Sequence, residues 1–359
     1  MSAACREVYR AEQLPVLQNR MFPTAQAARE CARGDVVLVQ SLETGLVFNQ
    51  AFRPELVEYD ADYQNEQGLS GAFARHLDAV LDLMRRHFAG RSLVEVGCGK
   101  GLFLERLLAA GFDVTGLDPT YEGSNPRVIK AFFTPETGIR ADGLVLRHVL
   151  EHVPDPLAFL AGLRDANGGE GRIYIEVPCL DWIARHHAWF DLFYEHVNYF
   201  RRVDFERMFG TVHEVGHSFS GQYLSVVADL ATLRTPRRPA SDEFALPSGF
   251  MNAIATSRAR LAASGDGGAI WGGASKGVIF ALFMERAGAA IDTVIDINPA
   301  KQGRHLAATG LVVQSPDEAM AHLPAGADVF VMNSNYLQEI EAMTSHRFHC
   351  LPIDHGSGT

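Results

Sequence analysis

The sequence has few cysteines, and no two of them stand in a C-x-x-C spacing. The five are spread over 359 residues, at Cys5, Cys31, Cys98, Cys179 and Cys350. An odd, dispersed set argues against a disulfide-stapled secreted domain and favours reduced thiols, as in the cytosol.

Long apolar runs and basic clusters are also missing. No apolar run approaches the roughly 20 residues that span a bilayer, and the first residues contain no apolar signal core. We therefore expect a cytoplasmic protein without a membrane partner. The formal charge is -11, and the 32 Lys and Arg are scattered. A nucleic-acid binder usually shows a basic face, so we expect a small-molecule substrate.

The composition is that of an ordinary globular protein, with 47% hydrophobic and 21% charged residues. At about 150 residues per domain, the length predicts two or three domains. Short apolar runs at 36–39 and 46–48 predict strands in a small N-terminal module, residues 1–69. The proline-rich stretch 232–249 is typical of a linker.

Periodicity predicts an α/β fold for the remainder of the chain. Apolar residues spaced by three and four indicate an amphipathic helix over 70–89. Strands and helices then alternate, which implies a parallel sheet covered on both faces. We expect strands at 93–96, 114–117, 143–146, 173–177 and 222–228, and helices at 102–110, 156–166 and 203–209, in one domain over 70–231. We expect a second α/β unit over 250–359, with a helix at 250–263 and strands at 269–271, 293–297 and 329–332.

A glycine-rich loop follows the first strand of the larger domain. Gly97, Gly99 and Gly101 let the backbone turn tightly and approach a ligand. Asp118 ends the next strand, 21 residues after Gly97, where a carboxylate can accept both ribose hydroxyls of a nucleoside. The spacing is G-x-G-x-G, with Leu102 where a dinucleotide fold places its third glycine. It favours S-adenosylmethionine (SAM) over NAD; the alternative is a glycine turn without a ligand.

These residues resemble the first motif of class I methyltransferases. The resemblance covers residues 95–101, the ribose-binding acid Asp118 and the segment 149–156 after the fourth strand. It implies SAM as cofactor. The cofactor-binding residues that we expect from the loop and the resemblance are Glu95, Gly97, Gly99, Gly101, Asp118 and His148.

Half of the 14 histidines lie between His148 and His217. The spacing of His148 and His152 would place both on one helix face, as in zinc sites. However, the segment 153–156 contains two prolines, which break a helix there. We therefore expect no metal at this pair.

Residues 193–200 alternate aromatic side chains with Glu195 and His196. One interpretation is an amphipathic element packed in the core. The other is a substrate-binding wall with an acid/base group. The segment follows a strand by about 20 residues, which favours the carboxyl edge of the sheet, where ligands bind.

This segment resembles the Glu-His motif of sugar carbon-methyltransferases, which act on nucleotide-linked 4-keto-sugars. The resemblance implies that His196 is the base and that Glu195 and His152 are active-site residues. It also implies that Tyr63 closes over the pocket. A tyrosine of that family corresponds to Phe193 here, so this chain lacks its hydroxyl.

The two ends of the chain resemble the same family. Its N-terminal zinc module has four cysteines, but only Cys5 remains here, with Ser41 and Thr44 near the second pair. One thiolate cannot hold tetrahedral zinc, so we expect a metal-free module. In the C-terminal unit, residues 270–277 read G-x-A-x-x-G, and Asp296 follows Gly272 by 24 residues. The family's Rossmann-like domain does not hold NAD. This loop is either an anion site with Lys276 or a plain turn.

The sequence therefore predicts a SAM-dependent methyltransferase for a small polar metabolite, with carbon methylation of a nucleotide-linked keto-sugar in sugar biosynthesis as the leading reaction. Methylation of oxygen or nitrogen is the nearest alternative. A SAM-binding scaffold without activity and an NAD oxidoreductase built on the C-terminal unit are further alternatives. The sequence does not identify the acceptor or the oligomeric state.

Overall fold

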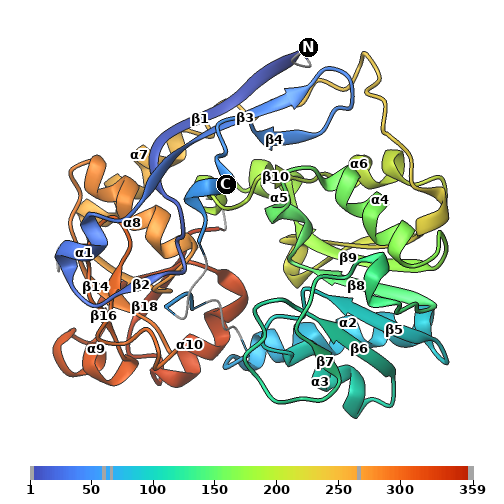
Figure 1. The fold of residues 1–359 in the computed structure, drawn as a ribbon. Coiled ribbons are helices and arrows are strands. Elements are labelled where there is room, and N and C mark those ends of the chain that lie inside the picture. The colour runs from blue at the N-terminus through green and yellow to red at the C-terminus, as the bar shows by residue number, and fades with distance from the viewer. Residues whose placement is uncertain (1–3, 59–61, 65–67, 265–267, 355–359) are drawn as a thin grey trace.

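The computed structural model describes residues 4–58, 62–64, 68–264 and 268–354. Figure 1 shows two α/β lobes side by side, with the N-terminal strands lying across both. The middle of the chain forms one lobe and its C-terminal part forms the other. Within the described residues, no helix is long and apolar enough to cross a membrane.

The larger lobe contains a seven-stranded sheet in the order β11-β12-β9-β8-β5-β6-β7. Only β12 runs against the other strands. Its strands are β5 Ser92–Val96, β6 Asp113–Leu117, β7 Val128–Ile129, β8 Gly143–Arg147, β9 Arg172–Pro178, β11 Val212–Ser218 and β12 Tyr223–Asp229. The strand order reverses at β5, because β6 lies on one side of it and β8 on the other. Ligands of open α/β sheets bind at such a switch point.

Helices cover both faces of this sheet, as the alternating pattern predicts. They are α2 Gly71–Phe88, α3 Leu102–Ala109, α4 Pro156–Ala166, α5 Leu180–Arg185 and α6 Arg202–Met208. Helix α2 begins after Ser70, whose hydroxyl oxygen accepts hydrogen bonds from the N–H groups of Ala72 and Phe73. Its apolar residues at spacings of three and four are buried. The expected strands and helices of this region are confirmed, with bounds shifted by one or two residues.

The N-terminal strands form an antiparallel sheet in the order β1-β3-β4-β10. They are β1 Cys5–Pro15, β3 Arg33–Ser41, β4 Val47–Asn49 and β10 Asn198–Tyr199, the last from the larger lobe. The two strands expected from apolar runs are confirmed, whereas β1 was missed because charged residues interrupt it. Gly34 allows close contact with the larger lobe, because a Cβ there would lie 2.2 Å from Tyr194 Cε2.

The C-terminal lobe is a parallel sheet in the order β16-β14-β13-β17-β18. The expected strands and the expected helix are confirmed. Its elements are α7 Asn252–Ala263, β13 Gly268–Trp271, α8 Lys276–Arg286, β14 Ile291–Ile295, β16 Val313–Gln314, α9 Pro316–His322, β17 Asp328–Val331, α10 Leu337–Met343 and β18 His349–Pro352.

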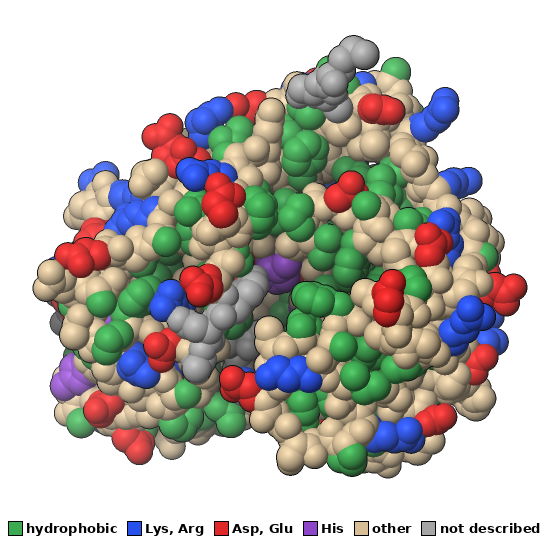
Figure 2. All heavy atoms as spheres, in the orientation of Figure 1, with side chains coloured by type: hydrophobic (Ala, Val, Ile, Leu, Met, Phe, Trp, Pro, Cys, Tyr) green, Lys and Arg blue, Asp and Glu red, His purple; other side chains and the backbone are tan. Residues whose placement is uncertain are grey.

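Strand pairing and a shared core hold the three parts together. Strand β2 (Met21–Phe22) of the N-terminal region pairs with β15 (His305–Leu306) of the C-terminal lobe. One cluster of buried residues contains Leu14, Ile175 and Phe280, one from each part. Figure 2 shows a hollow at the centre of this face, with histidine surface visible in it. The lobes are therefore packed around a central region to which each part of the chain contributes.

Candidate active site

The glycine loop at the end of β5 has the shape of a nucleoside cradle. Gly97, Gly99 and Gly101 have φ values of 71°, 54° and 82°, a left-handed conformation that favours glycine. A Cβ at Gly97 would also lie 2.6 Å from Val149 Cγ2. The loop therefore needs glycine for its conformation at all three positions and also for space at Gly97.

Asp118 lies beside this loop, at the end of β6. Its Oδ2 accepts a hydrogen bond of 2.8 Å from the Gly99 N–H. Its Oδ1 accepts from the N–H and the hydroxyl of Thr120, at 2.8 and 2.7 Å. The carboxylate is thus held at the edge of the cradle, where it can also accept ribose hydroxyls.

Glu95 is the buried acid beneath the loop. It is 3% exposed, and among the described residues its Oε2 has no hydrogen-bond partner. Burial raises the pKa of Glu95 to about 7, Asp118 adds to this rise, and the Arg147 cation opposes it. A cationic ligand would supply the missing partner. The left-handed loop, Asp118 and this unpaired carboxyl oxygen together fit SAM, whose nucleoside carries a ribose and whose methionine part carries an ammonium.

A buried glutamate in β9, Glu176, organises the neighbouring charges, and sequence reasoning missed it. It accepts hydrogen bonds from Arg147 at 2.7 Å and from the Tyr174 hydroxyl at 2.9 Å. His76 of α2 lies 3.2 Å away. Burial alone would raise the pKa of Glu176, but Arg147, His148 and His76 hold it well below its usual range. The signal in the sequence that could have revealed Glu176 is the presence of a glutamate inside an otherwise apolar strand.

His148 stands between two carboxylates. Its Nε2 lies 3.1 Å from Glu176 Oε1, and its Nδ1 lies 3.3 Å from Glu151 Oε1. Burial lowers the pKa of His148, but these carboxylates outweigh it and raise the pKa to about 9. With φ of 51°, His148 leaves the strand in a left-handed turn instead of starting a helix. His148 and His152 consequently do not share a helix face.

A second polar cluster brings together the four residues expected on the acceptor side. The Tyr63 hydroxyl donates to Glu195 Oε2 at 2.8 Å. His152 Nδ1 lies 3.0 Å from the Glu195 carbonyl oxygen and 3.9 Å from its Oε2. The His152 and His196 rings pack edge to face, with centroids 4.9 Å apart. The structure thus joins residues that are up to 133 positions apart in the sequence.

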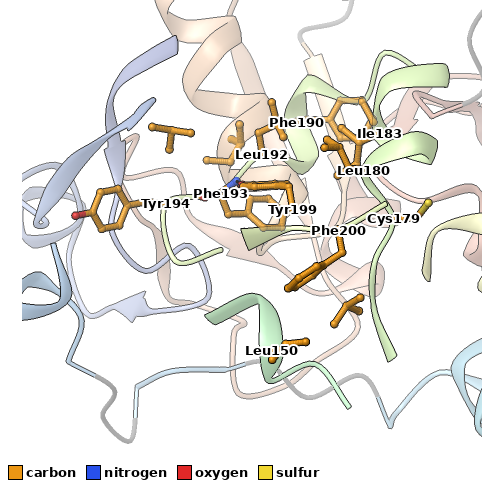
Figure 3. Packing of buried hydrophobic residues seen from close by; sticks show 14 of the residues in the cluster. Leu150, Cys179, Leu180, Ile183, Phe190, Leu192, Phe193, Tyr194, Tyr199 and Phe200 are labelled. Atoms are coloured by element: carbon orange, nitrogen blue, oxygen red, sulfur yellow. Dashed lines mark hydrogen bonds between the residues drawn. The ribbon is translucent and has the colours of Figure 1, made fainter. Parts of the chain in front are cut away.

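His196 lies against an apolar wall. The Phe193 ring packs edge to face against its imidazole at a centroid distance of 4.9 Å, and Tyr199 lies at 6.2 Å. Figure 3 shows Phe193, Tyr199 and Phe200 at the centre of a cluster of buried hydrophobic residues. Burial, with His152 and His148 nearby, holds the pKa of His196 well below its usual range. The imidazole is therefore neutral at pH 7 and keeps a lone pair.

All three parts of the chain reach this cluster, and sequence reasoning missed two of the contributors. Asn19 Nδ2 donates to the Tyr63 hydroxyl at 3.2 Å. The Ser275 hydroxyl of the C-terminal lobe donates to Asn19 Oδ1 at 2.7 Å. Ser275 lies in the G-x-A-x-x-G loop, but nothing in the sequence links it or Asn19 to Glu195, so only the folded structure reveals the chain of contacts that ends at Glu195.

The glycine loop of the C-terminal lobe does not hold Lys276 ready for an anion. Lys276 Nζ lies 3.1 Å from Asp191 Oδ2 and 3.0 Å from Gln222 Oε1, both in the larger lobe. Asp296 Oδ2 accepts from Gly273 N–H at 2.9 Å and from Lys301 Nζ at 3.1 Å. These internal contacts favour the plain turn over the anion site, and Lys276 ties the two lobes together.

Cys5, Ser41 and Thr44, the residues compared above with a zinc module, lie close together in the N-terminal sheet. Cys5 of β1 pairs with Ser41 of β3 in the antiparallel ladder. The Ser41 hydroxyl oxygen accepts from Thr44 N–H at 3.1 Å. Side chain-to-backbone hydrogen bonding from Ser41 therefore organises the turn that contains Thr44.

Comparisons with known proteins agree with this geometry. Residues 69–212 match the family model of the methyltransferase domain. Over 315 residues the chain is 25% identical to the C-methyltransferase NovU of Streptomyces niveus, covering 76% of this chain and 74% of that protein. Over 119 residues it is 33% identical to the ubiquinone biosynthesis O-methyltransferase of Ruegeria pomeroyi, covering 29% of this chain and 45% of that protein.

A solved structure with similarity to the chain is the 1,6-didemethyltoxoflavin-N1-methyltransferase of Burkholderia thailandensis, with bound S-adenosylhomocysteine. The TM-score is 0.34 at 15% identity, over 51% of this chain and 95% of that one. The sheet order, the cradle with Asp118 and the matched domain identify the chain as a SAM-dependent methyltransferase of the α/β, Rossmann-like class.

Proposed function

We propose that this methyltransferase acts on a small polar metabolite and methylates a carbon next to the ketone of a nucleotide-linked keto-sugar, with His196 as the general base. The observation that carries the proposal is the acceptor-side cluster of Tyr63, Glu195, His152 and His196. It combines a neutral imidazole with hydrogen-bonding groups in a partly buried setting.

The chemistry explains why such a cluster is needed. SAM supplies a methyl group that its sulfonium has already activated, so the protein's main tasks are alignment and proton removal. A carbon next to a ketone becomes nucleophilic when its C–H bond breaks and the proton moves to His196. The carbon then forms a bond to the methyl group as the bond from methyl to sulfur breaks. The resulting S-adenosylhomocysteine keeps the sulfur electron pair.

The developing enolate oxygen requires a hydrogen-bond donor. Tyr63 and His152 are the two candidates. In the structure, Glu195 lies against the hydrogen of each, at the Tyr63 hydroxyl and at His152 Nδ1, so the donor must turn this hydrogen from Glu195 to the enolate oxygen. Glu195 accepts from Tyr63 and so orients its hydroxyl. Glu195 lies in a bend and His196 directly follows it, both outside the helices, and Glu195 contacts Tyr63 and His152. We assign Glu195 to orientation and substrate binding.

The extent of the matches supports carbon as the methylated atom. The similarity to the C-methyltransferase covers 76% of this chain and so extends well beyond residues 69–212. The O-methyltransferase match covers 29%, a share smaller than the methyltransferase domain. Oxygen methylation stays the second candidate, since a neutral His196 could also remove a hydroxyl proton.

Exchange of hydrogen tests the proposed base. The full chain is incubated with a keto-sugar nucleotide and S-adenosylhomocysteine in heavy water, and deuterium is measured at the carbon next to the ketone. We expect exchange in the wild type and its loss in His196→Ala, which should bind SAM normally but lose about 10²–10⁴ in methyl transfer rate. His213→Ala is the matched control, because His213 pairs with Asp229 outside the cluster.

Two results would contradict the proposal. Exchange that persists in His196→Ala would move the base to another residue. Absence of both exchange and turnover with keto-sugar nucleotides in the wild type would favour methylation of oxygen or nitrogen.

A further inference from the structure

Three side chains of the types that ligate metals meet on the acceptor side of the site. Glu151, His152 and His196 each offer one atom, a carboxylate oxygen or an imidazole nitrogen, and these atoms all lie within 4.8 Å of one another. Two histidines and one carboxylate are a donor set for zinc and other late first-row divalent metals. The sequence predicted no metal at His148 and His152, whereas folding brings Glu151 and His196 to His152.

Two polar atoms in this cluster are buried without a protein partner. Glu151 is 1% exposed, and one of its oxygens, Oε1, lies 3.3 Å from His148 Nδ1. Within the part of the chain that the structure describes, its other oxygen, Oε2, and His196 Nδ1 have no hydrogen-bond partner. Buried polar atoms are costly to leave unsatisfied. A ligand that accepts electron pairs would satisfy both, since a carboxylate oxygen and an unprotonated imidazole nitrogen are donors of electron pairs.

The third group is already oriented as a metal-binding histidine. His152 Nδ1 lies 3.0 Å from the Glu195 carbonyl oxygen. A carbonyl only accepts hydrogen bonds, so Nδ1 carries a hydrogen and Nε2 is the nitrogen with which a metal would be bound. Histidines that ligate metals commonly hold their other ring N–H on a carbonyl or carboxylate in this way.

Backbone contacts fix the two segments that supply the ligands. The Val197 N–H donates to the Glu151 carbonyl at 2.7 Å, and Asn198 Nδ2 donates to the Val153 carbonyl at 2.6 Å. Val197 and Asn198 are the two residues that follow His196, and Val153 directly follows His152. The segments therefore face each other before any ligand binds, which lowers the cost of assembling a site.

We propose that Glu151, His152 and His196 bind a late first-row divalent cation such as Zn²⁺. Around a tetrahedral ion with bonds of about 2.1 Å, neighbouring ligand atoms lie about 3.4 Å apart. The ion therefore draws the three side chains together by roughly an ångström. Three protein ligands leave a fourth position for water or for an oxygen of the acceptor. The carboxylate offsets one of the two charges of the ion, and the imidazoles bind in their neutral form.

Occupancy has a consequence that rests on the proposed function. A neutral imidazole has one lone pair, so His196 cannot ligate the ion through Nδ1 and also accept a proton from the acceptor. The cation and the proton abstraction therefore compete, and Zn²⁺ inhibits methyl transfer while SAM still binds at its own cradle.

Direct binding of the metal is the test. The full chain is treated with chelator, dialysed and titrated with Zn²⁺ in a calorimeter, and Co²⁺ is added in parallel to record the absorption of the coordinated ion. We expect one equivalent to bind. His152→Ala and Glu151→Gln should each weaken binding at least about 10-fold, in line with losses seen even for outer-shell changes at metal sites. His213→Ala and Cys5→Ser, which alter a histidine and a thiol elsewhere, should leave it unchanged.

SAM affinity, measured on every variant, reports whether each is folded, and Glu151→Gln preserves the shape of the side chain. Absence of saturable binding in the wild type would overturn the proposal. Zn²⁺ affinity equal to that of the wild type in both Glu151→Gln and His152→Ala would also overturn it. Because no acceptor is present, these outcomes are independent of the proposed reaction. A chain that binds Zn²⁺ but shows no deuterium exchange would lose the keto-sugar function alone.

Discussion

The Tyr63 hydroxyl donates a 2.8 Å hydrogen bond to Glu195 Oε2, across 132 positions of sequence. The contact joins the segment that precedes α2 to the acceptor side of the large lobe. Asn19 and His152 extend it on either side. The N-terminal part of the chain therefore takes part in shaping the acceptor site.

Removing this hydroxyl should separate catalysis from cofactor binding. A hydrogen bond to a charged group contributes about 1.5–3 kcal/mol, so Tyr63→Phe should lower kcat/KM for the acceptor by roughly 10- to 100-fold. SAM affinity by calorimetry should not change. Tyr9→Phe is the control, because the buried Tyr9 hydroxyl has no hydrogen-bond partner among the described residues. Equal kcat/KM in Tyr63→Phe and wild type would remove Tyr63 from the mechanism.

Asp118 should dominate recognition of the nucleoside. Two charge-assisted hydrogen bonds to the ribose diol are each worth about 1.5–3 kcal/mol. Asp118→Ala should therefore weaken SAM binding at least about 10-fold, equivalent to about 1.4 kcal/mol. Asp113→Ala, at the exposed start of the same strand and paired with Arg127 at 2.8 Å, should bind SAM as the wild type does. Unchanged affinity in Asp118→Ala would show that the carboxylate does not contact the ribose.

The pKa of Glu95, raised to about 7 by burial, predicts pH-dependent cofactor binding. As pH rises through 7, Glu95 becomes an anion that attracts the cationic methionine end of SAM, so affinity should increase between pH 6 and 8. Glu95→Gln should flatten this profile of SAM affinity against pH in calorimetric titrations. If SAM affinity changes with pH in the same way in the wild type and in Glu95→Gln, a group other than Glu95 causes the change.

In the absence of SAM, the raised pKa of Glu95 has the opposite effect on stability. The folded state keeps the proton to a higher pH than the unfolded chain does, so the contribution of Glu95 to stability falls as pH rises towards 7.

The proline-rich segment 232–249 should contribute to stability, although its composition is that of a linker. Asp242 accepts hydrogen bonds from the 3%-exposed Arg201 at 2.7 and 3.0 Å and also contacts Arg207. Asp242→Asn should lower the free energy of unfolding by about 2 kcal/mol, the scale of a hydrogen bond to a charged group. Disruption of the exposed Arg202–Glu206 pair by Arg202→Ala should cost less than about 1 kcal/mol.

Urea denaturation at two pH values checks the same contact. Burial opposes ionisation, but Arg201 and Arg207 lower the pKa of Asp242 to about 2. The stabilisation is therefore present above pH 4 and is lost as pH falls towards 2. Equal losses in Asp242→Asn and Arg202→Ala would mean that the segment is only a tether.

The sequence by itself determined the fold class and the cofactor. Local periodicity and turn chemistry specify strands and helices, and the loop Gly97–Gly99–Gly101 with Asp118 encodes its own conformation within about 20 residues. These features depend on neighbours in the chain, so they can be read before the tertiary structure is known. The charged strand β1 escaped this reasoning because its alternation is interrupted.

Only the tertiary structure decided how the acceptor site is assembled. It brought Asn19, Ser275 and Tyr63 to Glu195, and it gave His152 the partners Glu151 and His196 instead of His148. It also occupied Lys276 with a tie between the lobes. The contacts of Asn19, Ser275 and Lys276 cross the boundaries between the three parts of the chain, whereas those among Glu151, His152 and His196 join distant segments of one part. Local motifs marked several of these residues but not their partners, because the hydrogen bonds and charges that define their roles come from segments that meet only when the chain folds.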